Sequence, residues 1–108
     1  MIDPSGVMAA LKQCNSILIS VHRNPDGDAL GSQLALMLAL QKTGKTVTVH
    51  NLDPVPEIYR FLPRAEQIRS GRPVAGRYDA YIVLDSDPPR TGLFDESIPA
   101  DTLINIDH

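Results

Sequence analysis

The sequence predicts an α/β domain: a mostly parallel β-sheet with helices on both faces, in a Rossmann-like three-layer arrangement. Three observations lead to this prediction. Short runs rich in β-branched residues alternate with helical patterns along the chain. These runs are apolar throughout rather than alternating with polar residues, which is typical of strands buried on both faces of a parallel sheet. The length of 108 residues is enough for one compact domain and too short for two.

The first half of the chain predicts a helix, a strand and a longer helix. A first helix begins at Asp3 or Ser5 and ends at residues 15–16, and a buried strand covers 17–21. Residues 29–42 have almost no polar face, so this helix is predicted to pack on both sides rather than lie on the surface.

The second half continues the same alternation. Gly44 follows the long helix as its C′ residue, and a second strand begins over 45–50. Residues 54–62 predict a short helix, and 60–77 form an irregular stretch whose five arginines are expected to face solvent. The last two predicted strands are 78–84 and 102–106.

Composition excludes several classes of protein. Ten Lys and Arg stand against thirteen Asp and Glu, and the net charge of −3 argues against a domain that mainly clamps polyanions. The single cysteine, Cys14, cannot form an internal disulfide and has no zinc-ligand spacing around it, so it is predicted to be a small, partly buried apolar residue. No signal peptide and no apolar run of about 20 residues is present, which predicts a cytoplasmic protein that does not contact membranes.

Acidic residues and histidines follow three of the four predicted strands. The segment 22–28 (HRNPDGD) follows the first strand, 85–87 (DSD) the third and 107–108 (DH) the last. The carboxyl ends of parallel strands meet at one edge of the sheet, so these carboxylates would repel one another unless a cation neutralised them. Imidazole and carboxylate ligands without thiolate suit manganese, iron, cobalt or zinc better than calcium.

Each of these residues also has an ordinary structural interpretation. The segment 25–27 fits a turn, with a positive φ at its glycine and a side-chain bond from its aspartate to the backbone. Asp28 can be interpreted as the N-cap of the long helix, and His22 as a hydrogen-bonded histidine at a strand end. Asp53 can be interpreted as a turn residue. The spacing excludes an EF-hand, and neither a dinucleotide-binding glycine fingerprint nor a Walker loop is present.

Three segments in order resemble the DHH phosphoesterase superfamily. They are 22–32 (HRNPDGDALGS), Asp85 followed by 90–92 (RTG), and 105–108 (NIDH). Within that superfamily the resemblance is closest to the bifunctional oligoribonuclease and pAp phosphatase group, the nanoRNase type. It extends from about residue 7 to the end, and its first motif is highly specific.

The resemblance implies two manganese ions, with Mg²⁺ or Co²⁺ as alternatives, held by ligands from three strand ends. The first ion would be held by His22, Asp26 and Asp85, and the second by Asp28, Asp85 and His108. Two such cations about 3.5 to 4 Å apart would share a water, lower its pKa and stabilise the attacking and leaving oxygens of an in-line displacement at phosphorus.

The resemblance also suggests roles beyond metal binding. Asp107 would orient neighbouring ligands and join Asp85 and His108 as a catalytic residue. Ser32, beside the first turn of the long helix, and Arg90 would contact substrate phosphate. For Arg90 a structural bond to a neighbouring loop is an equally good interpretation.

The activity implied by the resemblance is hydrolysis of very short RNA and of the 3′-phosphate of pAp. Two alternatives stay open: another superfamily activity, such as a cyclic dinucleotide phosphodiesterase or a manganese pyrophosphatase, and a domain that binds metal without catalysis. The family's third motif is Asp-His-His, whereas this sequence ends at the first histidine, His108. We therefore expect residues 1–108 to be an N-terminal domain cut within that motif, without its C-terminal substrate-binding domain and inactive alone. A homodimer is a further expectation.

Overall fold

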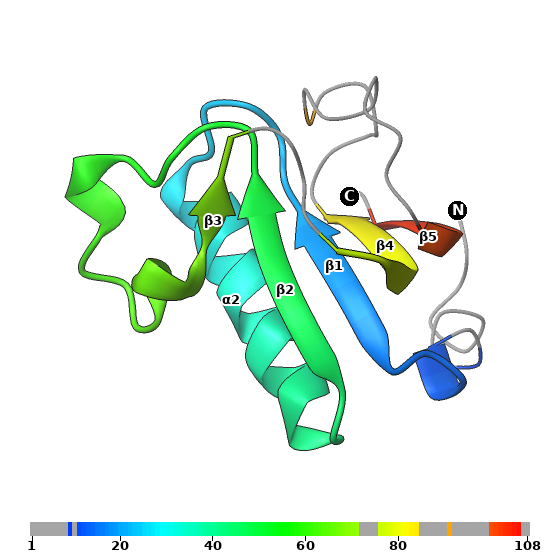
Figure 1. The fold of residues 1–108 in the computed structure, drawn as a ribbon. Coiled ribbons are helices and arrows are strands. Elements are labelled where there is room, and N and C mark those ends of the chain that lie inside the picture. Colours follow the sequence, from blue (N-terminus) through cyan, green and yellow to red (C-terminus); the bar gives the residue numbers. More distant parts are fainter. Residues whose placement is uncertain (1–8, 10, 72–75, 85–90, 92–99, 107–108) are drawn as a thin grey trace.

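A computed structural model describes residues 9, 11–71, 76–84, 91 and 100–106 of the chain. Its centre is a sheet of five parallel strands in the order β3-β2-β1-β4-β5 (Figure 1). The parallel α/β architecture predicted from the sequence is confirmed. The strands are β1 (Ser16–Ser20), β2 (Thr46–Asn51), β3 (Arg69–Ser70), β4 (Tyr78–Leu84) and β5 (Ala100–Ile106).

The long helix, α2 (Gly27–Lys42), crosses one face of the sheet (Figure 1). It begins two residues earlier than predicted because Asp26 caps it: Asp26 Oδ1 accepts a hydrogen bond from the Ala29 N–H at 2.8 Å. At its other end Gly44 has a φ of +86°, a conformation that L side chains rarely adopt. The prediction that Gly44 follows the C-cap is therefore confirmed.

The connection from β2 to β3 differs most from the prediction. The short helix expected over 54–62 is wrong in extent, because only η1 (Glu57–Tyr59) is helical, as a single 3-10 turn that starts after Pro56. A second 3-10 turn, η2 (Ala65–Gln67), precedes β3, which the sequence did not predict. β3 is two exposed residues long and pairs only with the end of β2, so it leaves no apolar pattern in the sequence.

Successive side chains of a strand point to opposite faces of the sheet, and the central strands β1 and β4 are buried on both faces. In β1, Ile17 and Ile19 join α2 in the main cluster, and Leu18 packs with Val83 of β4 on the other face. All four are fully buried, and each such side chain stabilises the fold by about 1.5–3 kcal/mol. The helical cover predicted for the second face lies outside the residues that the structure describes.

Only the end of the predicted first helix is described. Residues 9, 11 and 12 are helical, and the turn closes with the Cys14 N–H donating to the Leu11 carbonyl at 3.1 Å. Cys14 is buried in the main core cluster, more deeply than the partial burial predicted, and burial raises the pKa of its thiol. None of the described helices has both the length and the apolar character needed to cross a bilayer.

Candidate metal centre

The described candidate ligands, His22, Asp26 and Asp28, follow β1 at the point where the strand order of the sheet reverses. From β1 the chain builds outward to β2 and β3, then returns to the other side of β1 with β4 and β5. Ser20 pairs with Val83, and Leu84 pairs with Ile106, so these three strands end together at one edge. Ligands of open parallel sheets bind at this switch point, beyond the carboxyl ends of the strands.

His22 lies two residues beyond β1 and is half-buried. Its Nδ1 is 2.7 Å from the Arg23 carbonyl oxygen. A carbonyl only accepts hydrogen bonds, so Nδ1 is the donor of this bond, and Nε2 is the ring atom left to face a ligand. Metal-binding histidines commonly have this arrangement, in which one ring nitrogen donates to a backbone carbonyl and the other is a ligand.

Asp26 and Asp28 stand at the start of α2 with exposed side chains. Asp26, and not Asp28, is the N-cap, so the interpretation of Asp28 as the cap is wrong. The cap fixes one carboxylate oxygen of Asp26 and leaves Oδ2 available to a ligand. Asp28 lies in the first turn, where a negative charge interacts favourably with the helix dipole.

The loop between His22 and Asp26 is held from the neighbouring strand end. Asn24 has a positive φ of 50°, and its N–H donates to Asp53 Oδ2 at 2.8 Å. Asp53, predicted to be only a turn residue, is therefore a structural support of the candidate site. The clue in the sequence is that Asp53 follows β2 at the same sheet edge as the predicted ligands.

Gly27 is required by packing rather than by backbone conformation. Its predicted positive φ is wrong, because Gly27 is the first residue of α2. A Cβ at this position would lie 2.9 Å from Cε1 of Tyr59, closer than real Cβ contacts allow. The aromatic ring of Tyr59, in η1, therefore packs directly against Gly27, the residue that separates the candidate ligands Asp26 and Asp28 in the sequence.

The described residues hold only part of the predicted ligand set. Within them, no group of three or more His, Cys, Asp and Glu side chains is close enough together to hold a metal ion. The predicted Asp85, Asp107 and His108 lie outside the described residues, as does Arg90. Ser32, predicted to contact phosphate, is exposed one turn into α2. The donors that are described, an imidazole Nε2 and two carboxylates, suit Mn²⁺ chemically.

One buried atom near this edge lacks a partner. Asn105 Oδ1, in β5, is buried and accepts no hydrogen bond from the part of the chain that the structure describes. Buried polar atoms without partners are rare in folded proteins and often mark a functional site. Asn105 pairs with Val83 and comes two residues before Asp107, so this acceptor lies on the strand that leads to the predicted ligands.

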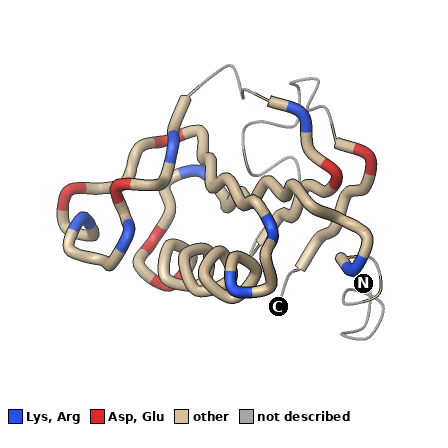
Figure 2. Tube along the Cα trace, turned by 60° about the horizontal axis from the view of Figure 1, so that its bottom comes forward, with Lys and Arg blue, Asp and Glu red and all other residues tan. Residues whose placement is uncertain are grey.

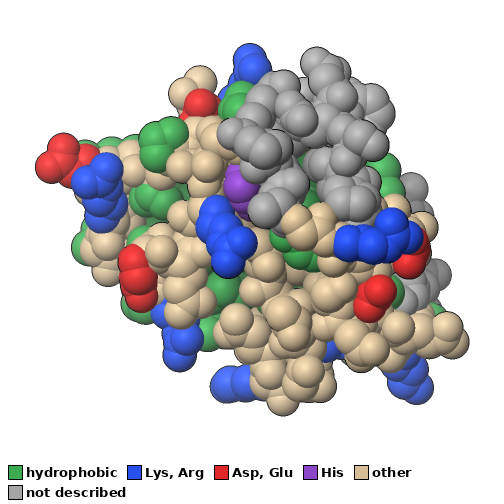
Figure 3. All heavy atoms as spheres, in the orientation of Figure 1, with side chains coloured by type: hydrophobic (Ala, Val, Ile, Leu, Met, Phe, Trp, Pro, Cys, Tyr) green, Lys and Arg blue, Asp and Glu red, His purple; other side chains and the backbone are tan. Residues whose placement is uncertain are grey.

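Charge is mixed over the described surface. Lys and Arg are interspersed with Asp and Glu along the chain (Figure 2). On the face drawn in Figure 3, the described part carries both signs side by side and no continuous basic surface. The described residues thus offer no extended groove for a long polyanion on this face.

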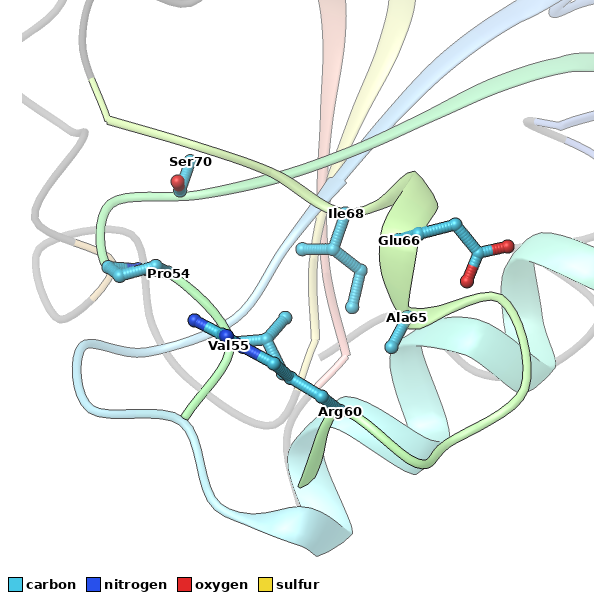
Figure 4. A pocket seen from close by; sticks show the side chains of 7 residues that line it. All are labelled: Pro54, Val55, Arg60, Ala65, Glu66, Ile68 and Ser70. Carbon is cyan, nitrogen blue, oxygen red and sulfur yellow. The ribbon is translucent and has the colours of Figure 1, made fainter. Parts of the chain in front are cut away.

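A pocket of about 260 Å³ lies in the β2–β3 connection (Figure 4). The Arg60 side chain extends along it toward Val55 and Pro54. None of the described candidate ligands lines it, so it is separate from the candidate metal centre. Its described lining residues are Pro54, Val55, Arg60, Ala65, Glu66, Ile68 and Ser70.

Comparison with known proteins identifies the family. The model of the DHH family N-terminal domain matches residues 16–108, which is most of the chain and includes every candidate ligand. This chain belongs to the DHH family. The resemblance seen in the three sequence segments is thereby confirmed.

A curated DHH relative and a solved structure extend this result. Bifunctional oligoribonuclease and PAP phosphatase NrnA of Thermus thermophilus is 37% identical over 93 residues, 85% of this chain. The chain spans only 27% of that relative's length. An exopolyphosphatase-related protein from Bacteroides fragilis superposes with a TM-score of 0.79 and 24% identity, over 96% of this chain and 34% of that one. At this identity the likeness supports the fold alone.

Proposed function

We propose that the protein to which this chain belongs is a metal-dependent phosphoesterase that hydrolyses very short RNA and the 3′-phosphate of pAp. One observation carries the proposal: at the switch point of a DHH-family sheet, His22 Nδ1 and Asp26 Oδ1 are engaged with the backbone, and within the described residues no hydrogen bond takes up His22 Nε2 or Asp26 Oδ2. The name of the Thermus relative, an oligoribonuclease and PAP phosphatase, supports the choice of substrates.

In this proposal two Mn²⁺ ions bind at the edge, with Mg²⁺ or Co²⁺ as substitutes. His22 and Asp26 hold the first ion together with Asp85, and Asp28 holds the second with Asp85 and His108. Such ions supply Lewis acidity and a water of lowered pKa for attack on phosphorus. The chain itself sets the orientation of each donor: the Arg23 carbonyl fixes the imidazole tautomer, and the capping bond fixes the Asp26 carboxylate.

The start of α2 is proposed to bind the substrate phosphate. Backbone N–H groups in the first turn of a helix attract anions, and the Ser32 hydroxyl lies one turn further along the same helix. Arg90 and the catalytic residue Asp107 complete the proposed set. The mixed surface charge favours short substrates, because a long RNA would need a basic groove for its many phosphates (Figure 3).

We further propose that residues 1–108 are the N-terminal domain of a longer cytoplasmic enzyme and are inactive alone. The 27% coverage of the Thermus relative supports a longer protein, in which a second domain would grip the substrate. A homodimer belongs to the same proposal, and light scattering on the full-length protein tests it.

The decisive experiment assays the full-length protein with Mn²⁺ on di- to pentanucleotides, pAp, cyclic dinucleotides and pyrophosphate. We expect hydrolysis of the short RNAs and pAp, loss of that activity with EDTA, and recovery on adding Mn²⁺. Intact oligonucleotides and pAp would overturn the substrate proposal. Cleavage of only pyrophosphate or only cyclic dinucleotides would favour another superfamily activity. Metal binding without turnover of any of these substrates would favour a non-catalytic domain.

A further inference from the structure

A pair of buried side-chain amides joins α2 to the end of β2. Gln33 lies in the second turn of α2 and Asn51 is the last residue of β2, and neither side chain is exposed to solvent. Gln33 Nε2 donates to Asn51 Oδ1 at 2.9 Å, and Asn51 Nδ2 donates back to Gln33 Oε1 at 3.0 Å. The two amides therefore form a reciprocal pair of hydrogen bonds inside the protein.

The same pair also binds the backbone of β1. Gln33 Nε2 donates to the Ile19 carbonyl at 3.0 Å, and the Val21 N–H donates to Asn51 Oδ1 at 3.0 Å. The backbone pairing of β1 with β2 runs only from Ser16 to Ile19. Beyond that point, side chains replace the ladder and hold the strand end that leads to His22.

These backbone contacts allow a single orientation of each amide. A carbonyl oxygen requires a donor, so Gln33 must direct Nε2 toward Ile19. A backbone N–H requires an acceptor, so Asn51 must direct Oδ1 toward Val21. The arrangement is consequently unique, and apolar side chains of similar volume would take this acceptor from the Val21 N–H and this donor from the Ile19 carbonyl.

The position of the pair connects the two elements that carry the described candidate ligands. Val21 immediately precedes His22, and Gln33 is on the helix whose first residues follow Asp26. A shift of the strand end relative to α2 would change the distance between the imidazole and the carboxylate. The loop tip has a separate support, the bond from Asn24 to Asp53, which does not reach the strand end.

We propose that Gln33 and Asn51 are positioning residues that hold His22 at the correct spacing from Asp26 for a divalent cation. This inference rests on the proposed metal centre. Groups that orient metal ligands from behind typically affect metal affinity by about 10- to 100-fold when they are removed. A pair that merely satisfies a buried strand end would affect the stability of the fold and leave metal affinity unchanged.

The test measures Mn²⁺ affinity of the full-length protein by electron paramagnetic resonance, with circular dichroism showing that each variant is folded. Gln33→Met keeps the volume and removes the amide, and we expect at least about 10-fold weaker Mn²⁺ binding. The matched control is Leu40→Ala, a core change at the far end of α2 that also lowers stability. The control is expected to bind Mn²⁺ as the wild type does.

Three further variants test the pair as a unit and guard against a variant that does not fold. Asn51→Leu is expected to weaken Mn²⁺ binding as Gln33→Met does. The Mn²⁺ affinity of the double variant is expected to equal that of whichever single variant binds more weakly. Asn51→Ser, a smaller change, provides the same comparison if either of the others fails to fold. Affinities for all folded pair variants within twofold of the Leu40→Ala control would overturn the inference.

The wild type separates this failure from failure of the proposed function. We expect His22→Ala to abolish the Mn²⁺ binding that the wild type shows. If the wild type binds no Mn²⁺ through His22, both proposals are overturned. If it does so and the pair variants match their control, only the positioning role is overturned.

Discussion

Two aspartates at opposite edges of the sheet show how the same side chain is put to different uses. Asp79 is the second residue of β4, and its Oδ2 accepts hydrogen bonds from the N–H groups of Asn15 and Ser16, at 2.7 and 3.1 Å. These two bonds hold the pKa of Asp79 below its ordinary value, and the charges of Arg77 and Lys45 act in the same direction. The chain itself compensates this negative charge.

Asp26, at the carboxyl edge, is compensated far less. It accepts one backbone N–H, and within the described residues no ion pair holds it or Asp28. Asp53 adds a third carboxylate at the same edge, bound to the Asn24 N–H. The comparison teaches that an acid surrounded by donors stabilises a turn, whereas an acid with few protein donors keeps its charge for a cation.

The largest expected effect is the loss of hydrolysis on Asp26→Asn, compared with the same exchange at Asp79. Asn caps helices as well as Asp does, so Asp26→Asn should change stability by less than about 0.5 kcal/mol. It removes a ligand charge, however, and we expect at least about 100-fold loss of Mn²⁺-dependent hydrolysis. Activity and thermal unfolding of the full-length protein check both values.

Asp79→Asn is the matched control for this change. It should leave Mn²⁺ affinity and hydrolysis unchanged, since Asp79 lies at the opposite edge of the sheet. Equal loss of activity in both variants would show that the two edges do not differ in function.

The next largest effect concerns the packing at the start of α2. Gly27→Ala should destabilise the protein by about 1–3 kcal/mol, because the new Cβ would meet Tyr59 Cε1. In a Tyr59→Ala background the same change should be neutral or stabilising by up to about 1 kcal/mol, since alanine favours helix. Chemical denaturation of the four proteins measures this coupling, and additive effects would refute the contact.

A smaller effect appears in the pH dependence of stability. Because the pKa of Asp79 is lowered below 3.8 in the fold, its stabilisation is complete above that pH and is lost as the pH falls through the lower folded value. The melting temperature of Asp79→Asn should therefore lie below that of the wild type at pH 7, and the gap should close under acid. A gap independent of pH would contradict this assignment.

The smallest effect is expected at the surface ion pair between Arg77 and Asp101. Its side chains are 75% and 63% exposed, and its shortest N–O distance is 3.2 Å. Arg77→Ala should change stability by less than about 1 kcal/mol, and less still at high salt. Melting curves at two salt concentrations check this, and a large loss would mean that surface charge matters more here than packing.

Much of the fold follows from local pattern. The β4 strand was predicted with the bounds that the structure has, because 78–84 is rich in apolar and aromatic residues, with Asp79 as its one charged member. By contrast, β3 has two exposed residues, and the pairing that defines it joins residues far apart in the chain. A strand that depends on such a contact leaves no local pattern.

The candidate site divides in the same way. The residue types of His22, Asp26 and Asp28 predict a metal site, but only the backbone geometry, with Asp26 at φ −89° and ψ 175°, decides which aspartate is the cap. Gln33 and Asn51 could not be found from the sequence. Polar residues within a helix and a strand are usually exposed, and their contact spans 18 positions.

The most direct test of the metal centre is anomalous diffraction from crystals of the full-length protein with Mn²⁺. The account predicts an anomalous peak bonded to His22 Nε2 and Asp26 Oδ2, with His22 Nδ1 still donating to the Arg23 carbonyl. Manganese bound elsewhere, with His22 Nε2 in contact only with protein or water, would contradict it.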